Sequence, residues 1–170
     1  MSSEYDTVGR PEFDFFHADK FDKIGNITDS QGVNYDVYHG DTLAFCPAVA
    51  LFLRVSAECY ERKLGGPYLS LGNNRRMLWA QHASTVVGGI CYEYEQESRV
   101  GAIILGFVRE DLRGRNIYGQ MHMIFEDEIR RIGGVRIYAQ IHADSKSQIR
   151  SLEKAGLTPY YLRLQQWITD

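Results

Sequence analysis

The sequence is poor in cysteine. Its three cysteines, Cys46, Cys59 and Cys91, are odd in number and lack a C-x-x-C pair, which argues against both a disulfide framework and a zinc site. We interpret them as reduced thiols, as expected for a cytoplasmic protein.

Long apolar stretches are also missing. The longest, residues 43–55, contains a proline and an arginine and is shorter than the roughly 20 residues that span a bilayer. The N-terminus has neither the basic nor the apolar region of a signal peptide. We therefore expect a cytoplasmic protein without membrane contacts.

The sequence has no surplus of positive charge. Its 19 lysines and arginines against 22 aspartates and glutamates give a net charge of −3, which argues against a broad nucleic-acid surface. The charge is uneven, because residues 1–41 contain nine acidic and three basic side chains and residues 109–163 contain ten basic and seven acidic ones. The two regions should meet different partners.

What the sequence does contain is enough apolar material for one compact domain. In a chain of 170 residues that is 44% apolar, burial can offset the entropy lost on ordering. No repeat or low-complexity linker divides the chain. We expect a single domain over residues 1–170, with residues 1–33 as an irregular acidic arm that contains several aromatic side chains.

Periodicity predicts strands and helices after residue 33. Strands are expected over residues 34–39, 77–82, 85–95, 100–108 and 135–142, with a last strand pair within 158–168. The unbroken apolar run at 100–108 is typical of a central strand. Helices are expected over residues 47–63, from Ile117 to Ile132 and from Ser145 to Gly156.

The junction between strand 100–108 and the following helix combines several features of an anion site. The first N–H groups of a helix lack intrahelical partners and lie at the positive end of the helix dipole. Gly114 allows close approach of the backbone, and Arg113 and Arg115 add positive charge. Walker and G-x-G-x-x-G spacings are absent. We interpret the junction as a phosphate or pyrophosphate site, with an ordinary basic loop as the alternative.

The segment RGRNIY at 113–118 resembles the Arg/Gln-x-x-Gly-x-Gly/Ala motif of the GNAT superfamily of acyl-CoA-dependent N-acyltransferases. SLEKAGL at 151–157 is similar to the family's C-terminal helix, and the resemblance extends from about residue 77 to residue 164. It implies an α/β fold with a central mixed, mostly antiparallel sheet, splayed at the fourth and fifth strands, and with helices on both faces. It also implies acetyl-CoA as cosubstrate and no metal.

By this resemblance, the cofactor is bound mainly by backbone groups. Those of residues 113–119 would surround the pyrophosphate, and those of Phe107 and Val108 would pair with the pantetheine arm. The implied contacts are Phe107, Val108, Arg113, Gly114, Arg115, Asn116, Ile117, Tyr118, Gly119 and Ser147. Asn116 and Tyr118 replace small residues of the motif. Asparagine tolerates left-handed backbone, whereas Tyr118 is expected to crowd the loop.

Acyl transfer to an amine needs a base for the amine, donors for the thioester oxygen and an acid for the thiolate. Three residues that assist in many family members are replaced here by Ala102, Ser145 and Leu152. Glu93 and Glu95, on one face of the neighbouring strand, are the candidate substitutes for the base. The alternative is that both are solvated or ion-paired strand residues.

The resemblance implies an enzyme that moves an acetyl group from acetyl-CoA to an amine acceptor by direct attack in a ternary complex. Two alternatives stay open. One is a module of the same fold that binds CoA without turnover, and the other is an acyltransferase for longer acyl chains. The expected partners are acetyl-CoA and the acceptor, without nucleic acid or membrane, and a homodimer is left open.

Overall fold

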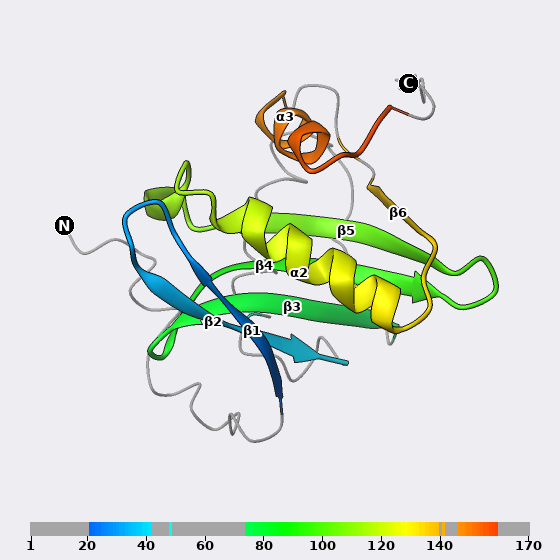
Figure 1. Ribbon diagram of the computed structural model, residues 1–170, viewed down its shortest axis with the longest axis horizontal. Helices are drawn as coiled ribbons and strands as arrows, with labels where there is room; N and C mark the ends of the chain where they lie inside the picture. Colours follow the sequence, from blue (N-terminus) through cyan, green and yellow to red (C-terminus); the bar gives the residue numbers. More distant parts are fainter. Residues whose placement is uncertain (1–20, 42–47, 49–73, 140, 142–145, 160–170) are drawn as a thin grey trace, which may run out of the picture.

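The computed structural model describes residues 21–41, 48, 74–139, 141 and 146–159. In chain order the elements are β1 (Asp22–Thr28), β2 (Asn34–Gly40), β3 (Arg75–His82), β4 (Thr85–Glu95), β5 (Val100–Val108), the 3-10 helix η6 (Glu110–Leu112), α2 (Ile117–Arg131), β6 (Arg136–Ala139) and α3 (Lys146–Lys154). The six strands lie side by side in chain order in one sheet, as Figure 1 shows.

The sheet is mixed and mostly antiparallel. Neighbouring strands from β1 to β5 pair antiparallel, and β6 pairs with β5 in parallel after the crossover through α2. The predicted sheet type is therefore confirmed. The strands predicted over residues 85–95 and 100–108 coincide with β4 and β5, and β6 is shorter than predicted.

Residues 22–28 correct the expectation of an irregular arm, since they form β1. The pairing of β1 with β2 slips between Lys23 and Gly25, which leaves Ile24 as an extra, bulged residue. The bulge interrupts the alternation of side chains by which a strand is identified in a sequence. A Cβ on Gly25 would lie 3.1 Å from Cδ1 of Ile124 in α2, so β1 approaches the helix closely.

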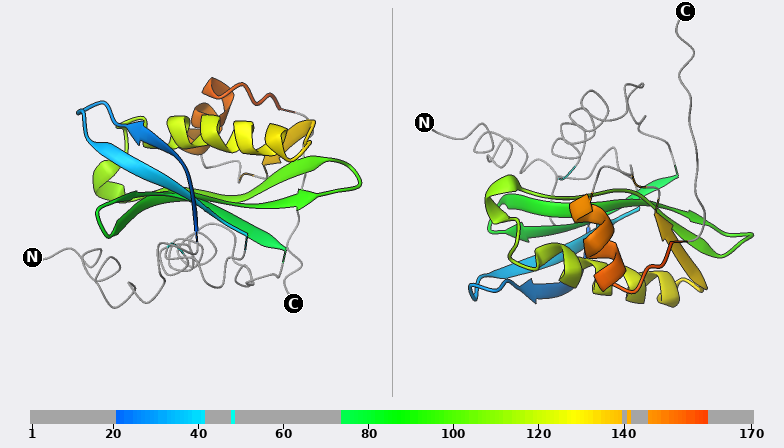
Figure 2. Two further views of the ribbon diagram at one scale, coloured as in Figure 1. Left: turned by 60° about the horizontal axis from the view of Figure 1, so that its bottom comes forward. Right: turned by 90° about the horizontal axis from the view of Figure 1, so that it is seen from above.

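The helix α2 packs on one face of the sheet and supplies the centre of the hydrophobic core. Ile117, Met121, Phe125 and Ile129 are at most 2% exposed, which confirms the predicted helical stripe. Leu152 of α3 joins the same cluster. Both helices therefore lie on the same side of the sheet, as the two views of Figure 2 show.

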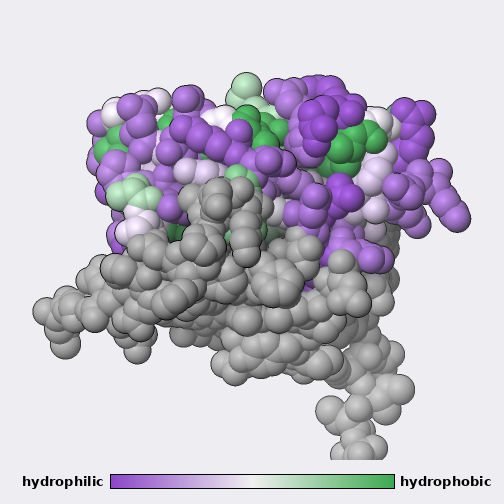
Figure 3. All heavy atoms as spheres, turned by 90° about the horizontal axis from the view of Figure 1, so that it is seen from below, coloured by the Kyte–Doolittle hydropathy of each residue, from purple (hydrophilic) through white to green (hydrophobic). Residues whose placement is uncertain are grey.

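Several expected elements lie outside the described residues. These are the helix over 47–63, the start of the last helix at Ser145, and residues 160–168 of the last strand pair. Within the described part, no helix has the length and apolar character needed to cross a membrane. On the side seen in Figure 3, the described surface is mostly hydrophilic, and its hydrophobic patches are separated by polar side chains.

Candidate active site

At one place along β5 the pairing with both neighbouring strands changes. Its pairing with β4 skips Ile104, an extra residue between the paired Ile103 and Leu105, so the strand contains a bulge there. Its pairing with β6 ends at Ile103 and Ala139. From Ile104 to Val108, the edge of β5 that faces away from β4 has no strand partner among the described residues. This separation matches the splay expected between the strands at 100–108 and 135–142.

Two side chains bond to carbonyl groups on this free edge. Arg113 Nε donates to the carbonyl of Val108 at 3.2 Å, and Gln148 Nε2 of α3 donates to the carbonyl of Gly106 at 3.4 Å. The first bond is at the long end of the range for N–H···O bonds, and the second is longer than that range. An amide of an extended ligand can therefore replace either donor at small cost.

The junction segment, residues 113–119, contains unpaired N–H groups. Asn116 is the N-cap of α2, its side chain makes no capping hydrogen bond, and the first turn of the helix contains no acidic residue. The backbone N–H groups of residues 114–119 have no acceptor within the described part of the chain. Unpaired N–H groups at a helix N-terminus attract an anion.

The backbone of the junction segment turns at two left-handed residues. Gly114 has a φ of 80° and Asn116 a φ of 64°, so the expected left-handed conformation of Asn116 is confirmed. A Cβ on Gly114 would meet no atom within 4 Å, and the positive φ is therefore the reason for glycine there. Left-handed residues in a turn direct successive N–H groups into one concavity, which suits a phosphate.

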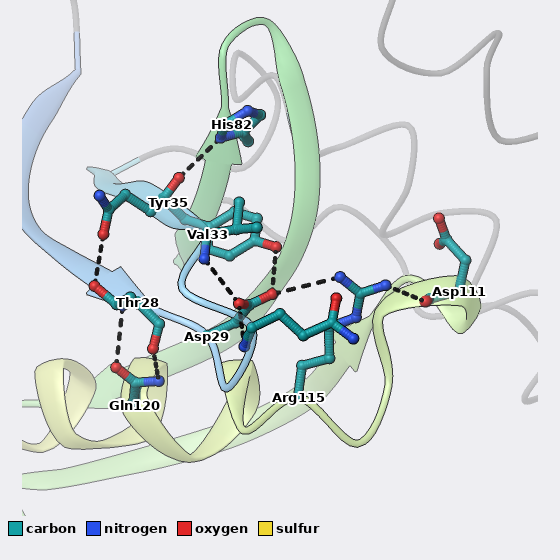
Figure 4. Close-up of polar contacts among 10 residues, drawn as sticks. Thr28, Asp29, Val33, Tyr35, His82, Asp111, Arg115 and Gln120 are labelled. Atoms are coloured by element: carbon teal, nitrogen blue, oxygen red, sulfur yellow. Dashed lines mark hydrogen bonds and ion pairs between the residues drawn. The ribbon is translucent and has the colours of Figure 1, made fainter.

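Arg115 is engaged with the loop between β1 and β2 (Figure 4). Its Nη1 lies 3.6 Å from Oδ2 of Asp29, and its Nη2 donates to the carbonyl of Asp111 at 3.4 Å. Its own carbonyl accepts a hydrogen bond from the N–H of Ser30 at 3.1 Å. The two predicted phosphate-binding arginines thus differ, because Arg113 is exposed near the free edge of β5 and Arg115 is paired elsewhere.

Tyr118 avoids crowding the junction segment by lying over Gly106 of β5. A Cβ on Gly106 would be 2.6 Å from the Tyr118 hydroxyl, so the ring requires glycine beneath it. The ring also lies near that of His122, with centroids 6.3 Å apart. Burial raises the pKa of the Tyr118 phenol above its usual value, which keeps the hydroxyl protonated at neutral pH.

Glu93 lies on the face of the sheet opposite α2. The register of β4 and β5 pairs it directly with Ala102, where the resemblance places the usual base, and directly paired residues have Cβ atoms about 4.5–5.5 Å apart. Arg75 Nε donates to Oε1 of Glu93 at 3.0 Å, and the glutamate side chain is 41% exposed. The structure therefore contains an ion pair at Glu93 and leaves its carboxylate accessible.

Glu95 and Cys91 are less suited to catalysis than Glu93, because one lies at the far end of β4 and the other is buried. Glu95 is exposed at the end of β4 and accepts a hydrogen bond from Ser98 in the following turn. Cys91 is buried, and burial raises the pKa of its thiol to about 12, which suits a structural thiol. Ser147 lies in the first turn of α3. In the part of the chain that the structure describes, no three metal-ligating side chains converge.

Three features of the site were not anticipated from the sequence: the bulge at Ile104, the bond from Gln148 to Gly106, and the pairing of Arg115 with Asp29. Gly106 could have indicated the bulge and the contact with Gln148, because a glycine inside a strand often marks a bulge or a close approach of another group to the backbone. Asp29 gave no local signal, since it is far from Arg115 in the sequence.

Solved structures share this fold, although no family model and no curated protein matches the sequence. The GNAT domain of S. lividans PAT has a TM-score of 0.64 at 17% identity, over 83% of this chain and 89% of that chain. An aminoglycoside acetyltransferase from an uncultured soil metagenomic sample has a TM-score of 0.61 at 14% identity, over 79% and 95%. A ribosomal-protein-alanine N-acetyltransferase from Brucella melitensis biovar Abortus 2308 has a TM-score of 0.59 at 14% identity, over 78% and 99%. The chain therefore has the fold of the GNAT acetyltransferases.

Proposed function

We propose that the protein is an acetyl-CoA-dependent N-acyltransferase. The main support is the bulge at Ile104 together with the end of the β6 pairing at Ile103. Beyond that point β5 stays paired with β4, and its other edge, which leads to the N-terminus of α2, has no strand partner among the described residues. The two amides of a pantetheine arm can pair with such an edge like an added strand. The pyrophosphate can then accept hydrogen bonds from the unpaired N–H groups of residues 114–119.

The bulge at Ile104 supplies the donor for the thioester oxygen in this proposal. Backbone groups of a bulged residue are left out of the ladder, and a fixed N–H stabilises an oxyanion because it does not reorient as the charge develops. The amine nitrogen attacks the thioester carbon and loses a proton to the base. The C–S bond then breaks, and the thiolate takes a proton from the acid, which gives the amide and the CoA thiol.

Glu93 is the proposed base and Tyr118 the proposed acid. Glu93 lies beside Ala102 with an accessible carboxylate, which can take the amine proton. Tyr118 compensates for Leu152, which stands where the resemblance places a phenol and is packed in the core. The Tyr118 phenol is protonated at neutral pH and can donate a proton to the thiolate as the C–S bond breaks, although burial raises its pKa and makes it a weaker acid than an exposed phenol.

Thermal shift with acetyl-CoA, free CoA and a long-chain acyl-CoA tests the cofactor. We expect acetyl-CoA and CoA to raise the melting temperature, and the absence of a shift with all three contradicts the proposal. Thiol release is then measured with aminoglycoside, polyamine and peptide amines as acceptors. Turnover with the long-chain acyl-CoA but not with acetyl-CoA would favour the longer-chain alternative.

Replacing Glu93 with Gln tests the base while keeping the shape of the side chain. The rate of thiol release should fall by about 100-fold or more, while the affinity for acetyl-CoA stays the same. Activity should appear at higher pH, where more of the amine is neutral. Glu95→Gln is the matched control on the same strand face and should leave the rate unchanged. An unaltered pH profile of Glu93→Gln would contradict the base role.

A CoA-binding module without turnover is the second candidate. It is favoured by Ala102 and Leu152, which are apolar and buried at the positions where the resemblance places the base and the acid. CoA binding measured by calorimetry, without thiol release from acetyl-CoA across the panel of amines, would select this candidate.

A further inference from the structure

Asp29, in the loop between β1 and β2, is a buried carboxylate whose two oxygens both have partners. Its Oδ1 accepts hydrogen bonds from the N–H groups of Gln31 at 2.8 Å and Val33 at 3.0 Å. Its Oδ2 accepts a hydrogen bond from the Tyr35 hydroxyl at 2.9 Å and lies 3.6 Å from Arg115 Nη1. Since the side chain is 0% exposed, its charge depends on these partners.

The surroundings of Asp29 keep it ionised. Burial raises the pKa of this carboxyl, but the hydrogen bonds from Val33, Tyr35 and Gln31 and the charge of Arg115 outweigh it, so the pKa lies below its ordinary value. The negative charge is therefore present at every physiological pH. Of the charged side chains in this network, only Arg115 is a cation.

The loop between β1 and β2 is attached to the start of α2 at two further points, of which Figure 4 shows the contact between Thr28 and Gln120. The N–H of Ser30 donates to the Arg115 carbonyl at 3.1 Å. The Gln120 side chain bonds both backbone groups of Thr28, with Nε2 donating to the carbonyl at 2.7 Å and Oε1 accepting from the N–H at 3.2 Å. The N–H groups of residues 116–119 thus lie between two attachment points.

We propose that Asp29 is a positioning residue for the cofactor, an inference that rests on the proposed binding of acetyl-CoA. Asp29 holds the guanidinium of Arg115, and Arg115 together with Ser30 fixes the backbone that presents N–H groups 114–119 to the phosphates. If Arg115 turned toward an anion, the buried carboxylate of Asp29 would keep its three hydrogen bonds but lose its cationic partner, which is costly. The side-chain charge for the phosphates then comes from Arg113.

The variant Asp29→Asn distinguishes two roles of Arg115. If Asp29 and Arg115 position the backbone, the variant should bind CoA more weakly, and if Arg115 binds a phosphate directly, it should not. The variant keeps the oxygen that accepts from Gln31 and Val33, and it removes the charge that holds Arg115. If Asp29 positions the junction segment, free CoA binds about tenfold more weakly in calorimetry. If Arg115 is a phosphate ligand, its release leaves the affinity equal or higher, which would overturn the proposal.

The matched control is Asp36→Asn on β2 of the same hairpin. Asp36 pairs with Lys23 at 2.7 Å, and both side chains are about half exposed. The substitution removes the same charge from the same hairpin without touching the loop. Its CoA affinity should equal that of the unaltered protein, and a loss as large as that of Asp29→Asn would overturn the specific role of Asp29.

A double-mutant cycle tests whether the two residues act through one contact. Arg115→Ala should weaken CoA binding as much as Asp29→Asn does, and the double variant should bind no more weakly than either single variant. Arg113→Ala should instead add its effect to that of Asp29→Asn. Additive effects of Asp29→Asn and Arg115→Ala would contradict a shared positioning role.

Hydrogen exchange provides a readout that does not depend on CoA. The N–H groups of Ser30 and Thr28 donate to Arg115 and Gln120, so Asp29→Asn should speed exchange at Ser30 and leave the amides of β4 unchanged. If the unaltered protein binds CoA and neither readout changes in the variant, the positioning role is overturned while the proposed function stands. If the unaltered protein does not bind CoA, the proposed function fails, and faster exchange at Ser30 still supports the attachment of the loop.

Discussion

The two ends of α2 differ in how their polar groups are satisfied. At the C-terminal end, the N–H groups of Gly133 and Gly134 donate to helix carbonyls at 3.0 and 2.7 Å, and Arg131 makes two bonds to the buried Glu128 at 2.6 and 2.7 Å. At the N-terminal end, no side chain caps the helix and no acid lies in the first turn. We call the C-terminal end of α2 the closed end, because residues near it in the sequence satisfy its polar groups. We call the N-terminal end, beside the splay, the open end, because its N–H groups remain available to an acceptor from outside the chain.

The open end is ordered by residues that are distant in the sequence. The Asp29–Arg115 pair and the bonds between Gln120 and Thr28 attach it to the loop between β1 and β2. None of these contacts covers the N–H groups of residues 114–119. The N-terminal end of α2 is therefore held by contacts from neighbouring elements while its own N–H groups stay unpaired.

Gly106→Ala is expected to have the largest effect, and it acts at the open end. A methyl group would lie 2.6 Å from the Tyr118 hydroxyl. The ring is partly buried against the core and cannot move without disturbing it, so the free energy of unfolding should fall by about 1–3 kcal/mol. CoA binding should also be lost, because the displaced ring moves toward the junction segment. Urea unfolding and calorimetry measure the two effects.

Gly101→Ala is the matched control near the closed end. There a methyl group would lie 2.7 Å from Cδ1 of Ile129, the far end of a flexible side chain that can rotate. The loss of stability should be about 1 kcal/mol or less, with CoA binding unchanged. If Gly106→Ala and Gly101→Ala lost the same amount of stability and of CoA affinity, the result would contradict the proposed difference between the two ends of α2.

The elements that local patterns specify were predictable from the sequence. The alternation at 85–95 and the apolar run at 100–108 gave the bounds of β4 and β5, because burial on one or both faces imposes these patterns directly. Asn116 was predictable for a similar reason, since left-handed backbone is a preference of the residue type.

Features that depend on distant residues were not predictable in the same way. The strand β1 was missed because the bulge at Ile24 interrupts its alternation. The contact of Arg115 with Asp29 was not predicted, because Asp29 lies in the β1–β2 hairpin, far from Arg115 in the sequence. The ring of Tyr118 was expected to crowd the loop, and the space that accepts it is provided by Gly106 on a different element.

Glu128→Gln is expected to have the next largest effect, and it acts at the closed end. The buried carboxylate loses its charged bonds to Arg131, so the free energy of unfolding should fall by about 1–2 kcal/mol, with CoA affinity unchanged. The bonds from Arg131 lower the pKa of Glu128, so its contribution is present at neutral pH and is lost as the pH falls below the ordinary glutamate range. The difference in the free energy of unfolding between the unaltered protein and Glu128→Gln should therefore become smaller at acidic pH.

Asp127→Asn is the control for Glu128→Gln. Asp127 pairs with Arg130 at 2.8 Å, but both side chains are mostly exposed, so the loss of stability should be about 0.5 kcal/mol or less. Urea unfolding at pH 7 and pH 4 measures both variants. A loss of CoA affinity in Glu128→Gln would show that the closed end also contributes to the proposed cofactor site.

His122 lies one turn after Tyr118 and links stability to pH near the open end. Its side chain is buried, and its Nε2 has no hydrogen-bond partner in the described part of the chain. Burial lowers the pKa of His122, so the unfolded chain takes up a proton near pH 6.5 while the folded chain does so only at lower pH. Stability should therefore fall as the pH drops below about 6.5.

His122→Phe should reduce the loss of stability between pH 7.5 and pH 5.5, measured by urea unfolding. Part of the loss should remain, because burial also lowers the pKa of His39. The comparison is with the unaltered protein over the same pH range. The same pH dependence in His122→Phe would contradict the contribution of this histidine.

Asn116→Asp is expected to have the smallest effect on stability. It is the most direct test of whether the unpaired N–H groups at the open end bind the cofactor. A negative charge at the N-cap should stabilise the helix by about 0.5 kcal/mol, because it interacts favourably with the unpaired N–H groups and with the helix dipole. The same charge should weaken CoA binding, since it competes with the phosphates for the N–H groups. Asn116→Gly keeps the left-handed backbone without the charge and should retain CoA affinity. A more stable Asn116→Asp variant with unchanged CoA affinity would mean that the cofactor does not use these N–H groups.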